Sequence, residues 1–162
     1  MIRLRPLTMD DAPELRRVYH GGSVHFLGRG EMTGEDAERY IERIQAWAKE
    51  EPVVHHVLGI DHAGDLVGVV KLRRVGTHGR VSYVLREDTW GSGYATEAVK
   101  QLVVYAFTTA SLDSLGAKHH PNNPASGRVL TKVGFECVGT SNMHAVDGVV
   151  VPHLVYELHH AR

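Results

Sequence analysis

The sequence has little cysteine, no long apolar run and no excess of one charge, and each absence excludes a class of protein. Cys137 is the only cysteine among 162 residues, so no internal disulfide can form and we expect a reducing, cytoplasmic compartment. No apolar run approaches membrane-spanning length, and Arg5, Asp10 and Glu14 interrupt the apolar core that a signal peptide needs. Lys and Arg number 18 against 19 for Asp and Glu, without a basic run. We therefore expect neither nucleic acid nor a membrane as the partner.

The length predicts one domain over residues 1–162, large enough for a genuine core. Twelve histidines are unusual for such a chain, but they come mostly as pairs and singles. Neighbours within a strand point to opposite faces, and no pair has the helical i, i+4 spacing of a zinc site. We expect no metal.

Hydrophobic periodicity and capping residues predict a mixed α/β protein. An Ile-Arg-Leu-Arg alternation opens the chain as a strand, and Thr8 with Asp11 and Thr33 with Asp36 form capping-box patterns at two helix starts. Strands are expected at 2–7, 53–60, 66–73, 81–85, 112–119, 135–145 and 149–158, and helices at 8–19, 34–50, 95–110 and 121–134. The strands flanking the third helix must run parallel because a helix connects them, and the last two strands form a closing hairpin.

The strand at 81–85 is followed by a small-residue loop and a helix start, Trp90-Gly91-Ser92-Gly93-Tyr94-Ala95. The first N–H groups of a helix have no partner within it, and the helix dipole adds positive charge there. Gly91 and Gly93 let the backbone approach a ligand closely, so this stretch predicts a phosphate site. Thr96 stands where the dinucleotide fingerprint needs its third glycine, and the Gly-Lys-Ser/Thr ending of the mononucleotide loop is absent.

Residues 90–98, Trp-Gly-Ser-Gly-Tyr-Ala-Thr-Glu-Ala, resemble motif A of the GNAT acyl-CoA N-acetyltransferases, Gln/Arg-x-x-Gly-x-Gly/Ala. The Gln/Arg position of the motif is occupied by Trp90 here. In this departure the sequence resembles the ribosomal-protein acetyltransferase branch of the family (RimJ/RimL-like). Residues 121–135 also match the family's second signature, Pro-x-Asn-x-x-Ser followed by a helix ending in Lys-x-Gly-Phe. The resemblance implies the GNAT fold, a central, mixed, mostly antiparallel seven-stranded sheet flanked by about four helices. Its two parallel strands splay apart and admit the pantetheine arm of acetyl-CoA.

The same resemblance implies acetyl-CoA as the co-substrate and assigns residues to it. The glycine loop would hold the pyrophosphate, free backbone groups around 83–86 would pair with pantetheine, and Arg128 and Lys132 are candidates for the adenosine 3′-phosphate. The expected cofactor-binding residues are Val84, Leu85, Arg86, Trp90, Gly91, Ser92, Gly93, Tyr94, Ala95, Thr96, Asn123 and Ser126. Simpler roles remain open for several of them. Trp90 could pack against the core, while Thr96 and Asn123 could serve as ordinary helix-start residues.

Two hydroxyl groups are the candidate catalytic residues. Ser126 resembles the residue that lies near the sulfur in this branch, where it would protonate or stabilise the departing thiolate. A helix first-turn serine that bonds the local backbone is the alternative. Tyr83 lies on the strand beside the expected cofactor channel. The alternative role for this residue is to pack its ring in the core, with the hydroxyl at the rim of the core.

The general base is not identified by the sequence. Many relatives place Glu at the start of the central strand, where this chain has Arg80. An ammonium acceptor must lose a proton before it attacks the thioester. The candidates are an ordered water or one of His25, His78, His119, His120, His144, His153 and Glu31.

The leading hypothesis is transfer of the acetyl group from acetyl-CoA to a primary amine, either a protein N-terminus or a small molecule, directly in a ternary complex. No cysteine lies in the motifs, which disfavours a thiolate acyl-enzyme. The absent Glu at position 80 motivates the alternative, a catalytically silent acyl-CoA-binding sensor or partner module. A homodimer is left open.

Overall fold

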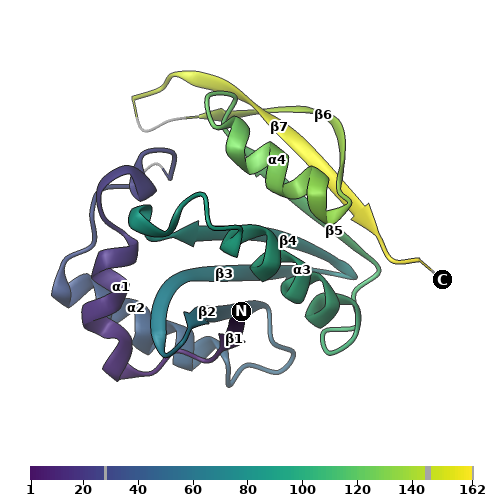
Figure 1. The fold of residues 1–162 in the computed structure, drawn as a ribbon. Coiled ribbons are helices and arrows are strands. Elements are labelled where there is room, and N and C mark those ends of the chain that lie inside the picture. Colours follow the sequence, from purple (N-terminus) through teal and green to yellow (C-terminus); the bar gives the residue numbers. More distant parts are fainter. Residues whose placement is uncertain (28, 145–146, 162) are drawn as a thin grey trace.

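The computed structural model describes residues 1–27, 29–144 and 147–161. In this part of the chain seven strands form one mixed sheet in the order β1-β2-β3-β4-β5-β7-β6 (Figure 1). The strands are β1 (Ile2–Arg5), β2 (His55–His62), β3 (Asp65–Val75), β4 (His78–Leu85), β5 (Ser114–His119), β6 (Glu136–His144) and β7 (Val150–His159). The helices are α1 (Ala12–Val18), α2 (Gly34–Trp47), α3 (Tyr94–Phe107) and α4 (Pro124–Val133). The predicted fold class is confirmed.

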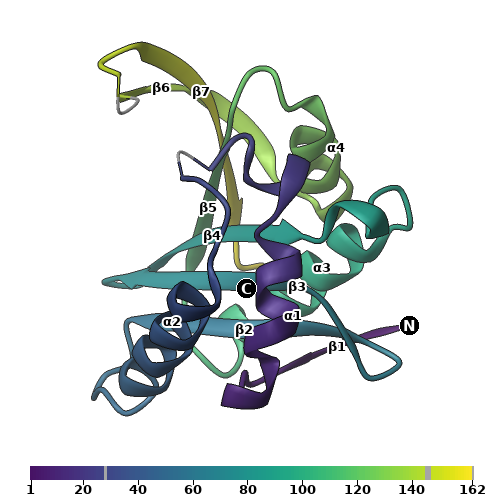
Figure 2. The same cartoon turned by 90° about the vertical axis from the view of Figure 1, so that its left-hand side faces the viewer.

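Two pairs of helices cover the two faces of the sheet, as the perpendicular views show (Figures 1 and 2). The α1–α2 pair packs on β2, β3 and β4, with Ala37, Ile41 and Ile44 of α2 buried in that layer. Helices α3 and α4 pack on the opposite face, where Leu102 is fully buried. Apolar residues at helical spacing bury one stripe of each helix, and that burial holds the layers together.

Capping and turn residues predicted where most of the helices and strands begin or end. Thr33 and Asp36 exchange reciprocal hydrogen bonds of 3.0 and 3.1 Å at the start of α2, as the capping pattern predicts. The first helix begins as a 3₁₀ turn, Met9–Asp11, and the expected loop after it contains another, Gly21–Val24. The central strand begins at His78, three residues before its expected start, because it continues a tight hairpin from β3. Position 145, the expected end of the sixth strand, lies outside the described residues.

Strands β4 and β5 are the only parallel neighbours among the described strands, and their pairing is short. It covers only His78–Arg80 against Ser114–Gly116. Beyond it, β4 continues beside β3 while β5 continues beside β7. The two strands therefore separate at their carboxyl ends, as the resemblance to the GNAT fold implied. Among the described residues, no helix is long and apolar enough to cross a membrane.

Candidate active site

A cavity of about 410 Å³ opens where β4 and β5 part, between the end of β4, the loop before α3, and α4. We call it the β4–α4 cleft. Its lining includes eleven residues that the sequence assigned to cofactor binding or catalysis: Tyr83, Val84, Leu85, Trp90, Gly91, Gly93, Tyr94, Ala95, Thr96, Asn123 and Ser126. Arg128 and Lys132 of α4 also line it and add positive charge. Segments far apart in the sequence thus meet at one cavity.

The backbone of β4 presents hydrogen-bonding groups to this cleft. The Arg86 amide donates to the Val67 carbonyl on β3 at 2.8 Å. Because backbone groups alternate in direction along a strand, those of Leu85 and Tyr83 face the opposite side, where β5 has already diverged. The Trp90 indole donates to the Leu85 carbonyl at 3.1 Å. The backbone groups of Tyr83 and the Leu85 amide thus face the cleft.

The loop before α3 has the geometry of an anion cradle. Gly91 and Gly93 adopt φ values of +81° and +78°, which side chains other than glycine rarely tolerate. Apart from the glycine itself and its two chain neighbours, no described heavy atom lies within 4 Å of a β-carbon built on either glycine, so this backbone is open to a ligand. Gly93 caps α3, whose first-turn amides have no partner within the helix. Ser92 is exposed and does not line the cleft.

Two hydroxyl groups meet inside the cleft. The Tyr83 and Ser126 oxygens lie 2.9 Å apart and share a hydrogen bond. Burial raises the pKa of the Tyr83 phenol above 10.0, and the bond to Ser126 opposes this only in part. Tyr83 is therefore protonated at neutral pH and able to donate. Among the described atoms, the Asn123 side chain makes no capping hydrogen bond, which leaves its amide available to the cleft.

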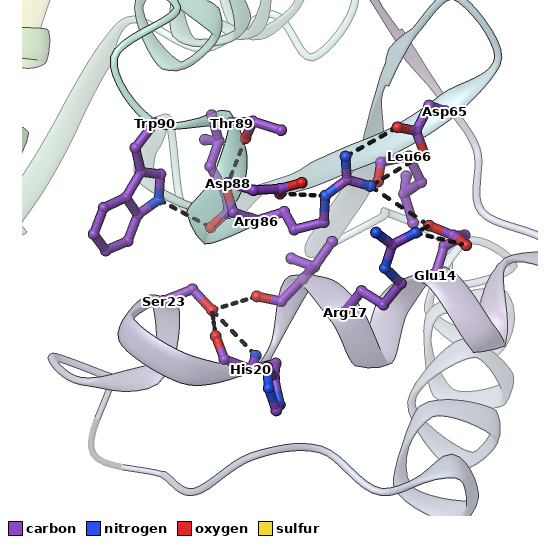
Figure 3. Close-up of polar contacts among 12 residues, drawn as sticks. Glu14, Arg17, His20, Ser23, Asp65, Leu66, Arg86, Asp88, Thr89 and Trp90 are labelled. Carbon is purple, nitrogen blue, oxygen red and sulfur yellow. Dashed lines mark hydrogen bonds and ion pairs between the residues drawn. The ribbon is translucent and has the colours of Figure 1, made fainter.

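Arg86 does not line the β4–α4 cleft, although the sequence placed it among the cofactor-binding residues. Its side chain points toward Asp65, Asp88 and Glu14 (Figure 3). Its guanidinium bonds both Asp65 oxygens at 3.1 and 3.0 Å and Asp88 at 2.6 Å. Glu14 of α1 lies 3.5 Å away. The Arg86 carbonyl accepts from the Thr89 hydroxyl at 2.7 Å. Arg86 thus fastens the turn before the glycine loop to α1 and β3.

The segment after α1, which the sequence offered as part of the acceptor site and as the source of the candidate base His25, closes one side of the β4–α4 cleft. Phe26 and Leu27 line the cavity together with Gly22 and Ser23. The Gly22 amide donates to the Glu87 carboxylate at 2.7 Å, and the Ser23 hydroxyl donates to the Val18 carbonyl. Ser23 also accepts from the His20 amide at 3.2 Å (Figure 3). The individual contacts of Phe26 and Leu27 with the cleft were not predicted, although exposed aromatic residues in a glycine-rich stretch indicated a functional loop.

The structure separates the candidate bases into two groups. The Phe26 ring lies 4.6 Å from that of His25 and 5.0 Å from that of His120, which in turn lies 5.3 Å from the His153 ring. Burial, and then the neighbouring His153 and His25, lower the pKa of His120 below 6.5. We call His25, His120 and His153 the histidine cluster.

The other candidates have structural partners or lie elsewhere. Buried His119 bonds the His120 carbonyl at 2.9 Å and the Tyr156 hydroxyl at 3.4 Å. His78 bonds Ser114, and Glu31 pairs with His20 outside the cleft. His144 is exposed at the end of β6. Among the described residues, no group of three or more His, Cys, Asp or Glu side chains could hold a metal ion.

Comparison with known proteins decides the family. The model of the acetyltransferase (GNAT) domain matches residues 2–136. The chain belongs to the GNAT acetyltransferases. The probable N-acetyltransferase YjcK of Bacillus subtilis is 31% identical to this acetyltransferase, over 95% of this chain and 91% of that protein. The fold and the enzyme class predicted from the sequence are thereby confirmed.

Solved structures of GNAT proteins superpose on this acetyltransferase over nearly its whole length. Mycobacterium smegmatis RimJ in complex with CoA-disulfide has a TM-score of 0.82 and 25% identity, covering 98% of this chain and 81% of that one. The ribosomal-protein-S5-alanine acetyltransferase of Vibrio fischeri has a TM-score of 0.81 and 18% identity, covering 98% and 92%. The RimJ structure supports the RimJ/RimL-like branch, and the Vibrio fischeri structure supports the fold.

Proposed function

We propose that this protein moves the acetyl group of acetyl-CoA to a primary amine by direct transfer in a ternary complex, within one domain that spans the chain. The observation that carries the proposal is the pair of hydrogen-bonded hydroxyls, Tyr83 and Ser126, beside an open glycine loop at the start of α3. That combination suits a phosphorylated thiol carrier whose sulfur must be protonated as it leaves.

The residues present fit CoA in chemistry. The α3 amides and the open backbone of Gly91 and Gly93 suit a pyrophosphate. Arg128 and Lys132 suit a further phosphate, and the Asn123 amide suits the pantetheine amides. The RimJ structure contains CoA-disulfide, which supports the same ligand here.

Transfer requires two proton movements, and the chain has a group for each. The amine nitrogen loses a proton and forms a bond to the thioester carbonyl carbon, and the carbon–sulfur bond then breaks. Tyr83, kept protonated by burial, donates to the departing sulfur through or beside Ser126. The Tyr83 backbone amide, facing the cleft, is suited to stabilise the oxyanion.

The histidine cluster supplies the base in this proposal. The His153 Nδ1 lies 3.2 Å from the Val151 carbonyl, which can only accept, so Nδ1 carries the hydrogen. In the neutral ring Nε2 then keeps its lone pair. By contrast, His120 Nδ1 accepts from the Asn122 amide at 3.0 Å. His153 is accordingly the better acceptor of a proton.

Titration with CoA by calorimetry, followed by incubation with acetyl-CoA and a panel of amines, tests the proposal. We expect heat on CoA addition and release of free thiol with at least one primary amine. Heat without thiol across a broad panel would favour the silent acyl-CoA-binding module, and the absence of heat would contradict both. His153→Gln should slow thiol release at least tenfold without weakening CoA binding, whereas His159→Gln, on the exposed end of β7, should change neither.

A further inference from the structure

A second cavity, of about 590 Å³, lies on the opposite face of β4 from the glycine loop. It opens between α2 and strands β2, β3 and β4, and nothing in the cofactor assignment uses it. Its size suits a small molecule. We call it the arginine cleft, after the cationic side chains that line it: Arg29, Arg39, Arg43, Lys71, Arg73 and Arg80.

The charge of the arginine cleft is strongly one-sided. Six of the 18 Lys and Arg residues line it, in a chain whose net formal charge is only −1. Asp36 is its one acidic residue, and hydrogen bonds to Thr33 hold that carboxylate at the start of α2. Among the described residues, only Arg39 of the six cations has an ion-pair partner, Glu35. A cleft lined by one sign of charge concentrates ligands of the opposite sign.

The sheet register brings two of these cations face to face. Arg73 on β3 and Arg80 on β4 are direct cross-strand partners, and Lys71 is opposite Ser82 two residues along. Like charges opposite each other destabilise a sheet. Residues two apart on a strand share a face, so Lys71 and Arg73 project to the same side. This row of cations is unfavourable in the empty cleft and favourable around an anion.

The arginine cleft adjoins the proposed transfer site through β4. Ser82 lines the arginine cleft, whereas the next residue, Tyr83, lines the β4–α4 cleft. Residues 80–82 of β4 line the arginine cleft and residues 83–85 line the β4–α4 cleft, so the two cavities follow one another along this strand. Beside it, the pairing of β4 with β5 ends at Arg80. An acceptor in the arginine cleft would therefore reach the thioester through the opening between these strands.

We propose that the arginine cleft binds the amine acceptor, and that the acceptor is a small primary amine bearing a phosphate or carboxylate group. This inference rests on the proposed acetyl transfer. Arg73 and Arg80 bind the anionic group of the acceptor, and its amine then points toward the opening beside Tyr83. Basic peptides and polyamines are repelled by the same residues.

Amines matched in size but different in charge test this acceptor class. Phosphoethanolamine and glutamate should be acetylated with at least tenfold higher kcat/KM than ethanolamine and putrescine. Because the contacts are electrostatic, raising the ionic strength should increase the KM of the anionic amines only. Equal or better use of the neutral, cationic or peptide amines would overturn the inference while leaving acetyl transfer intact.

Two double variants that remove the same amount of charge test whether the preference for anionic amines arises in the arginine cleft. Arg73→Gln with Arg80→Gln should lower kcat/KM for phosphoethanolamine at least tenfold and leave CoA affinity and ethanolamine turnover unchanged. Arg3→Gln with Arg16→Gln removes the same charge from exposed positions outside the cleft and should do nothing. Equal effects of the two double variants would contradict a local site.

A binding measurement separates this inference from the proposed function. Pyrophosphate titrated into protein already saturated with CoA should release heat, and the Arg73→Gln, Arg80→Gln variant should not. Heat that both proteins give equally, or that neither gives, would overturn the anion site. Failure of CoA itself to bind would instead overturn the proposed function.

Discussion

The hydroxyl oxygens of Tyr83 and Ser126 lie 2.9 Å apart, although the two residues are 43 positions apart in the sequence. Tyr83 comes from the end of β4 and Ser126 from the first turn of α4. The two elements belong to the two sides of the opening between β4 and β5. The hydrogen bond therefore connects the two walls of the β4–α4 cleft at the position proposed for the departing sulfur.

Removing the Tyr83 hydroxyl should slow the reaction with little effect on binding. We expect Tyr83→Phe to lower kcat by about 10²-fold, the scale of general acid catalysis, with the CoA dissociation constant nearly unchanged. Steady-state kinetics and calorimetry check both values. Tyr156→Phe is the matched control, because that hydroxyl bonds His119 and lines neither the β4–α4 cleft nor the arginine cleft. A Tyr83→Phe enzyme with normal kcat would remove Tyr83 from the mechanism.

The glycine loop should respond to a single methyl group. Gly93→Ala places an alanine at φ +78°, which costs about 1–2 kcal/mol, and adds a β-carbon on the open side of the loop. We expect a lower melting temperature together with at least tenfold weaker CoA binding. Gly64→Ala, at φ +88° with open surroundings in the β2–β3 turn, should show the stability loss alone. Equal CoA affinity in both variants would contradict a role of the glycine loop in binding CoA.

Arg86 should contribute to stability more than an exposed ion pair does. Its guanidinium is buried while its partners Asp65 and Asp88 are half-exposed or exposed. Arg86→Met should therefore cost about 2 kcal/mol, between the values for surface and fully buried pairs. The expected fall in melting temperature is about 4–8 °C. Arg17→Met, which breaks an exposed pair with Glu14, should change it by no more than about 1–2 °C.

Acid should unfold the protein partly through the carboxylates around Arg5. The hydrogen bond from Arg5 lowers the pKa of Asp61 below 3.8, and for Asp11 the bonds from Arg5 and Thr8 outweigh burial, which alone would raise its pKa. Carboxylates with lowered pKa stabilise the fold above the unfolded pKa of about 4, and this stability is lost as the pH falls through the folded pKa values. Urea midpoints should accordingly drop below about pH 4.

The Arg5→Met variant checks that assignment. Without the guanidinium, the pKa values of Asp61 and Asp11 should rise toward their ordinary range. The variant should be less stable at pH 7, and its urea midpoint should depend less on pH between about 4 and 2. If the urea midpoint of the variant fell with pH in the same way as that of the unaltered protein, acid unfolding would be due to other groups.

The glycine loop and the α4 signature were predictable because their chemistry is local. Helix caps, positive-φ glycines and a helix N-terminus act over a few residues, so the residue pattern around Gly93 and Thr33 is sufficient to specify them. Arg86 shows where such reasoning fails. The family resemblance placed Arg86 among the free backbone groups of the central strand, but its amide is bonded to Val67 of β3 and its side chain to Asp65, 21 positions earlier.

The sequence alone determined the order of elements, the family and the glycine loop before α3, because periodicity, capping and turn residues depend on near neighbours in the chain. Only the tertiary structure decided that Tyr83 meets Ser126, that His25 and His120 meet at Phe26, and that Arg73 faces Arg80. These contacts depend on strand register and on the divergence of β4 from β5. Both follow from how the whole sheet packs between its helices, which no short stretch of residues encodes.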